Sequence, residues 1–132
     1  MVYVDTNILV YLLEGTPRYA QSVARELASF RQRGLKFYGS TLLVSEFTAG
    51  TSGTIGDLRM VGELSFIPVS EPIATLSGLL QRKHTIKIGD SIHLATAIEM
   101  GYKTFFTNDK KLAAVASKYL SAKLLSDHLD VS

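Results

Sequence analysis

The sequence contains no cysteine among its 132 residues, which excludes disulfide bonds and metal sites built on thiolates. Its three histidines, His84, His93 and His128, are not separated as the ligands of a structural zinc site are. A metal ion bound by this chain would therefore rest on oxygen ligands, which favours Mg²⁺ or Mn²⁺.

Long apolar runs are also missing, and no segment approaches the length that spans a membrane. The chain starts on the apolar run Val2-Tyr3-Val4, without a basic leader or the apolar core of a signal peptide. We therefore expect a cytoplasmic protein without a membrane partner. Its length suits a single domain covering residues 1–132.

The net charge is small, +2, and does not by itself indicate a nucleic-acid partner. If four of the acids gather in one site, however, the rest of the chain carries an excess of positive charge. A basic surface around an acidic pocket would suit a polyanion that is cut at a metal ion. The alternative is that the Lys and Arg side chains only solvate helix faces.

Short apolar runs alternate with segments of helical periodicity along the chain. The expected strands are Val2–Val4, Leu35–Tyr38, Ser65–Val69 and Lys103–Phe106, with a further short strand at Leu124-Leu125. The expected helices cover residues 8–13, 18–33, 41–49, 57–64, 71–83 and 90–100, and a last helix follows Asp109 to about Tyr119. Pro68 favours an edge position for the third strand. This alternation predicts a three-layer α/β/α fold, in which a parallel sheet has helices on both faces.

Four acidic residues stand where these predicted elements begin or end. Asp5 follows the first strand and Asp109 follows the fourth, while Glu46 and Asp90 lie in helices. Because the carboxyl ends of parallel strands meet at one edge of the sheet, we expect the four side chains to converge there. Crowded carboxylates raise each other's pKa, and a divalent cation would offset their repulsion. The chemistry expected of such a site is in-line hydrolysis of a phosphodiester.

Each acid also has a structural interpretation. Asp109 is well placed as a helix N-cap, and Asp90 is either an N-cap or a first-turn acid favoured by the helix dipole. Glu46 could be a solvated helix residue, and Asp5 could cap the helix that follows it. These interpretations stay open beside the functional one.

The helix that begins at Asp90 is apolar on most sides but carries a polar stripe. Asp90, His93 and Thr96 recur every third residue and therefore share one face. On a largely buried helix this stripe indicates a lined cavity, with His93 as a supporting site residue. The competing interpretations are a hydrogen-bonded core histidine and a threonine that packs helices.

Four segments, in this order, resemble the PIN-domain family and, within it, the VapC-type toxin ribonucleases of VapBC toxin–antitoxin systems. They are Asp5-Thr6-Asn7-Ile8, the helix that contains Glu46, the run from Gly89 to Ala97, and Thr107-Asn108-Asp109. The resemblance spans essentially the whole chain. It implies a parallel sheet of about five strands flanked by helices, and a Mg²⁺- or Mn²⁺-dependent endoribonuclease.

By this resemblance Asp5, Glu46, Asp90 and Asp109 are the catalytic and metal-binding acids. Asp5 and Asp90 would bind the principal metal ion. Glu46 would bind it directly or through water and help to deprotonate the attacking water. Asp109 would complete the metal's shell or bind a second ion.

The resemblance also implies supporting contacts and partners. Thr6, Asn7 and Thr107 match positions that hold the acids in place. The family commonly forms homodimers, and its toxins are neutralised by a small antitoxin protein whose tail fills the active-site groove. Several basic side chains would either hold phosphates of the RNA substrate or only solvate the surface: Arg59, Arg82, Lys83, Lys87, Lys110 and Lys111.

Other proteins with an acidic pocket on a parallel sheet fit the sequence less well. A haloacid-dehalogenase-type phosphatase needs a second aspartate two positions after Asp5, where this chain has Asn7. A response-regulator receiver needs an aspartate after the third strand, where Ser70 and Glu71 stand. The remaining alternative is a non-catalytic PIN module that binds RNA or a protein partner and keeps the acids as remnants.

Overall fold

The computed structural model describes residues 1–125, and His128 lies outside this part of the chain. Its strands are β1 (Val2–Val4), β2 (Phe37–Ser40), β3 (Leu64–Ile67), β4 (Thr104–Thr107) and β5 (Ser121–Leu124). Its helices are α1 (Thr6–Glu14), α2 (Pro17–Gln32), α3 (Thr41–Gly50), α4 (Ile55–Arg59), α5 (Glu71–His84), α6 (Ile88–Glu99) and α7 (Lys110–Ala116). Within residues 1–125 no helix combines the length and apolar character needed to cross a membrane.

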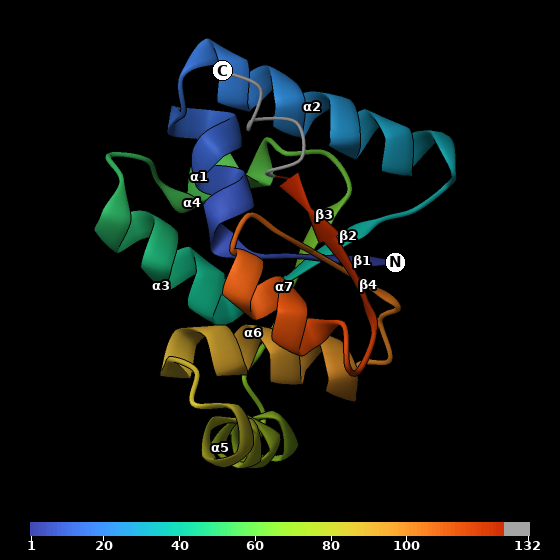
Figure 1. Cartoon of the computed structure of the whole chain (residues 1–132). Helices are drawn as coiled ribbons and strands as arrows, with labels where there is room; N and C mark the ends of the chain where they lie inside the picture. The colour runs from blue at the N-terminus through green and yellow to red at the C-terminus, as the bar shows by residue number, and fades with distance from the viewer. Residues whose placement is uncertain (126–132) are drawn as a thin grey trace.

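The five strands form one parallel sheet in the order β3-β2-β1-β4-β5, which confirms the predicted α/β fold. Successive residues of the central strand β1 point to opposite faces. Val2 and Val4 pack in one core with side chains of α1 to α4, whereas Tyr3 packs in a second core with side chains of α5, α6 and α7. Figure 1 shows α5 beyond α6, so that one face of the sheet carries two helices in depth.

The predicted boundaries differ most around β3 and β5. The helix expected at 57–64 ends at Arg59, and Glu63 has a φ of 68°, which a right-handed helix does not allow. The last strand is Ser121–Leu124 rather than Leu124-Leu125. The apolar pattern did not predict its first residues, because two of its four side chains are polar. β3 is an edge strand, as Pro68 indicated, and Pro68 follows its last paired residue.

The carboxyl ends of β1 and β4 lie side by side in the middle of the sheet. The two strands pair up to Val4 and Phe106, and the N–H of Asp5 then donates to the carbonyl of Phe106 at 2.9 Å. β2 pairs with the other side of β1 and ends at Ser40, whose side chain caps α3. α1, α3 and α7 therefore begin at the same edge of the sheet.

Candidate active site

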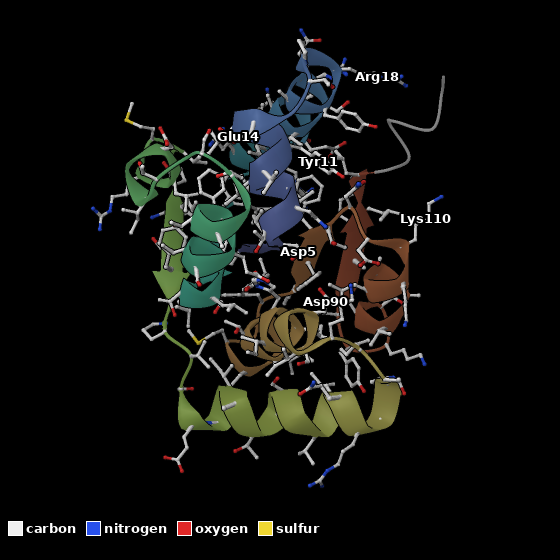
Figure 2. The ribbon with its side chains drawn as sticks, turned by 90° about the vertical axis from the view of Figure 1, so that its left-hand side faces the viewer. Asp5, Tyr11, Glu14, Arg18, Asp90 and Lys110 are labelled. Atoms are coloured by element: carbon white, nitrogen blue, oxygen red, sulfur yellow. The ribbon has the colours of Figure 1, made fainter. Side chains whose placement is uncertain are left out.

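Three carboxylates line one hollow at the carboxyl edge of the sheet. Asp5, Glu46 and Asp90 share a hollow of about 320 Å³, whose other lining residues are Thr6, Asn7, Val10 and Tyr11. Figure 2 shows Asp5 at the foot of α1 and Asp90 on α6, bordering the same space. Within residues 1–125 no group of three acidic or histidine side chains is positioned to hold a metal ion without side-chain movement. The structure thus brings the three acids together around a space, and their catalytic roles stay predictions.

Asp109 does not line this hollow, but its charge contributes to raising the pKa of Asp90, so the two groups lie near each other. Its side chain accepts from the N–H of Leu112 at 3.0 Å and caps α7, as the structural interpretation predicted. Asp90 is not an N-cap, because Lys87 occupies that position in α6. Asp90 is instead an acid of the first helical turn.

Asp5 is only 4% exposed, and both of its oxygens accept hydrogen bonds. Oδ1 accepts from the N–H of Thr6 at 2.8 Å, and Oδ2 accepts from the hydroxyl of Thr107 at 2.7 Å. Burial raises the pKa of Asp5, because these bonds and the charge of His93 offset only part of the desolvation, and the charge of Glu46 raises it further. Asp5 therefore caps α1 and faces the hollow at the same time.

His93 connects Glu46 to the interior of the protein. Its Nε2 lies 2.6 Å from Oε1 of Glu46, and its Nδ1 lies 2.5 Å from the hydroxyl of Tyr3, which accepts from the N–H of Ser40. Glu46 only accepts, whereas the Tyr3 hydroxyl can donate, so a neutral His93 carries its proton on Nε2 and donates it to Glu46. The side chain is thus a hydrogen-bonded core histidine and a support of Glu46 at once.

Glu46 differs from the other two acids of the hollow in the direction of its pKa. Burial would raise this pKa, but the bonds from His93 and Thr6 and the charge of His93 lower it overall. The hydroxyl of Thr6 donates to the same oxygen, Oε1, at 2.6 Å. At Asp90, in contrast, burial and the charges of Asp5 and Asp109 raise the pKa. The crowding expected from the sequence is therefore present at Asp5 and Asp90, and hydrogen bonds outweigh it at Glu46.

Burial would lower the pKa of His93, but its bond to Glu46 and the surrounding carboxylates raise it overall. Thr96, the third member of the polar stripe, is buried and donates to the carbonyl of Ile92 at 2.6 Å.

Asn7 contacts the site differently from Thr6 and Thr107. Its Oδ1 accepts from the N–H of Asn108 at 3.2 Å and so anchors the segment between β4 and α7 rather than a carboxylate.

Sequence reasoning missed two residues that support Glu46. Tyr3 stands in an apolar strand, and only strict alternation along that strand would have placed it on the side opposite its two valine neighbours. In the sequence Gly89 stands out only as the first residue of the run from Gly89 to Ala97. A Cβ atom at position 89 would lie 2.8 Å from Oε2 of Glu46, so glycine allows α6 to approach this side chain.

The family model of the PIN domain matches residues 2–118. The chain belongs to the PIN domain family. No curated protein matches it with statistical significance. The fold is similar to VapBC2 from Rickettsia felis bound to a promoter DNA fragment (TM-score 0.72, 20% identity, covering 94% of this chain and 98% of that chain). It is also similar to FitAcB from Neisseria gonorrhoeae (TM-score 0.66, 20% identity, covering 95% of this chain and 98% of that chain). A further similar structure is the sarcin–ricin loop cleaving toxin VapC20 from Mycobacterium tuberculosis (TM-score 0.68, 15% identity, covering 86% of this chain and 94% of that chain).

Gly89→Ala tests whether this PIN domain depends on the close approach of α6 to Glu46. Alanine is a better helix former than glycine by about 1 kcal/mol, and its Cβ would displace only the end of the Glu46 side chain. We expect the free energy of unfolding to stay constant or rise slightly, while the metal-dependent activity that the sequence predicts falls about tenfold or more. Thermal denaturation and turnover of one preparation measure both quantities.

The matched control is Gly78→Ala on α5, where a Cβ atom would meet nothing within 4 Å. This variant should gain stability and keep its activity. A destabilised Gly89→Ala protein, or one with full activity, would contradict the assigned role of Gly89.

Asp90→Asn tests whether crowding of carboxylates destabilises the metal-free PIN domain. The dipole of α6 favours a first-turn acid, but the raised pKa of Asp90 means that burial and neighbouring charges outweigh it. A carboxyl with a raised folded-state pKa stabilises the fold below its unfolded pKa, and this contribution is lost as pH rises through the folded pKa. In EDTA we therefore expect Asp90→Asn to melt above the wild type at neutral pH.

The difference should be about 1 kcal/mol or less, because Asp90 is only partly buried and solvent screens its charge, which corresponds to a few degrees in Tm. It should vanish near about pH 4, where the unfolded-state carboxyl is itself half protonated. Equal melting temperatures at neutral pH would contradict the account.

His93→Gln and His93→Asn separate the two contacts of His93. A glutamine amide nitrogen can reach the position of Nε2, near Glu46, whereas an asparagine amide reaches only the position of Nδ1, near Tyr3. We expect the Asn variant to lose about 10- to 100-fold in Mn²⁺ affinity and activity, and the Gln variant to retain most of both. Calorimetric Mn²⁺ titration and turnover test this. Equal losses in the two variants would mean that His93 acts only by filling the core.

Proposed function

We propose that this PIN-domain protein is a Mg²⁺- or Mn²⁺-dependent endoribonuclease that hydrolyses RNA phosphodiester bonds. One observation carries the proposal: Asp5, Glu46 and Asp90, distant in sequence, line one hollow, and Asp109 lies close enough to affect Asp90. Burial raises the pKa of both Asp5 and Asp90, so the metal-free hollow is electrostatically unfavourable. A cation would remove this cost.

The donor set suits a hard divalent cation, because it consists of carboxylate oxygens without a thiolate. Asp5, Glu46 and Asp90 would hold the ion, and Asp109 would complete its shell or hold a second one. Glu46 and Asp90 are only partly buried, so their carboxylates can turn toward an ion that buried Asp5 binds. When bound, the ion would neutralise the crowded charge, polarise the scissile phosphate and lower the pKa of a nearby water.

The side chains of the chain itself would orient the reactants. Thr6 and His93 hold Oε1 of Glu46 and keep the group ionised, which leaves Oε2 able to accept the proton of the attacking water. Thr6 and Thr107 fix Asp5, while each of its oxygens retains a further lone pair. In the reaction the water oxygen would bond to phosphorus as its proton passes to Glu46. The bond from phosphorus to the leaving ribose oxygen would break, and that oxygen would take up a proton from solvent.

The fold's likeness to VapBC2, FitAcB and VapC20 favours the toxin of a toxin–antitoxin pair. VapC20 is described as cleaving the sarcin–ricin loop, which is why we infer RNA rather than DNA as substrate. We also infer a small antitoxin protein, a homodimer and a cytoplasmic location. An Arg or Lys side chain of the antitoxin could enter the acidic hollow in place of the cation.

A cleavage assay tests the enzyme proposal. We expect the protein to cut RNA with Mg²⁺ or Mn²⁺ and not with EDTA, because the carboxylates alone cannot neutralise the phosphate. Asp5→Ala and Asp90→Asn should each reduce the rate by about a hundredfold or more. Glu99→Gln, an exposed acid at the far end of the same helix as Asp90, is the control and should cleave normally.

The possible outcomes separate the hypotheses. Full cleavage by both Asp variants would remove the site assignment. RNA binding without cleavage under every metal condition would favour the non-catalytic PIN module instead.

A further inference from the structure

The hollow that contains the carboxylates also has an apolar side. Val10 and Tyr11 line it together with Asn7, and these residues share one face of α1 because they lie three or four positions apart. Both apolar side chains are partly buried and partly exposed. Neither has a charge with which to bind a cation or a phosphate, so the proposed metal chemistry leaves this wall without a role.

The ring of Tyr11 is held in place from two sides. It stacks on the ring of Tyr19 from α2, with centroids 5.0 Å apart and planes 19° from parallel. Its hydroxyl accepts from Nδ2 of Asn108 at 3.0 Å. Asn108 lies between Thr107, which fixes Asp5, and Asp109, so the ring is tied to the segment that positions the acids. An aromatic face fixed in this way loses little conformational freedom when a ligand stacks on it.

We propose that Tyr11, backed by Tyr19, forms a nucleobase-binding subsite beside the scissile phosphate. The proposal rests on the RNA substrate proposed above. Unpaired bases of single-stranded RNA stack on aromatic side chains, and a base adjoining a phosphate at the carboxylates lies within reach of the same hollow. Figure 2 shows Tyr11 above Asp5.

A purely structural role would give a different result. If Tyr11 and Tyr19 only pack α1 against α2, replacing the ring of Tyr11 changes the stability of the protein. Its effect on RNA binding is then the same whether or not the RNA carries bases. If Tyr11 stacks a base, the effect of losing the ring depends on the presence of that base. Two substitutions at this position separate these cases: Tyr11→Leu keeps apolar bulk without an aromatic face, and Tyr11→Phe keeps the ring without the bond to Asn108.

Binding is measured in the inactive Asp90→Asn background with two probes. One is a short single-stranded RNA of mixed sequence, and the other is the same strand with abasic nucleotides. We expect Tyr11→Leu to weaken binding of the base-bearing strand by about tenfold and of the abasic strand by less than about twofold. Tyr11→Phe should stay within about twofold on both strands.

An equal loss on both strands, or no loss on either, would overturn base stacking and leave the RNA substrate in place. If neither the wild type nor the Asp90→Asn protein binds either strand, RNA is not the substrate and both proposals fall. Thermal melts of each variant identify any loss of binding that reflects unfolding.

Ring-proton NMR supplies a measurement that keeps the ring of Tyr11 intact. The chain has six tyrosines, and the signal missing from the Tyr11→Leu spectrum identifies Tyr11. Adenosine 5′-monophosphate should shift this signal upfield in the Asp90→Asn protein, and ribose 5-phosphate should not. Equal shifts with the two ligands, or none with either, would overturn the subsite.

Discussion

Repulsion among carboxylates at the carboxyl edge of the sheet is the constraint on which the arrangement of the site depends. The parallel strands β1 and β4 end side by side, so Asp5 and the segment with Asp109 start from the same edge. α6 then adds Asp90, and burial and the charges of Asp5 and Asp109 raise its pKa. Such a group is more stable when it is protonated or lies beside a cation. An ionised carboxylate at this edge therefore costs the fold some stability.

The supporting hydrogen bonds give the three acids of the hollow different freedom. Asp5 is buried and bonded at both oxygens, so its position is fixed by the sheet. Glu46 is held at Oε1 only, and Asp90 is partly exposed in the first turn of its helix. One rigid carboxylate with two adjustable ones would suit the proposed ion, which would also have to admit a substrate phosphate.

The short strand β1 contributes to both sides of this arrangement. It ends at Asp5, and its middle residue, Tyr3, points to the face covered by α6, where its hydroxyl meets His93. His93 in turn holds Glu46. A displacement of β1 would therefore disturb two of the acids at once, one through the backbone and the other through a buried tyrosine and histidine. This coupling explains why a tyrosine with a buried hydroxyl stands between two valines.

The sequence by itself determined the succession of strands and helices along the chain, the edge position of β3 and the cap formed by Asp109. These features depend on local forces: apolar periodicity, the missing N–H of proline, and a bond from a side chain to a backbone group three residues away. The meeting of Asp5, Glu46 and Asp90 could also be predicted, because parallel strands share a carboxyl edge. Only the tertiary structure decided that Tyr3 supports His93, that Gly89 makes room for Glu46 and that Asn7 anchors Asn108. Those contacts join residues far apart in the chain, and their existence depends on how the helices pack, which no local pattern specifies.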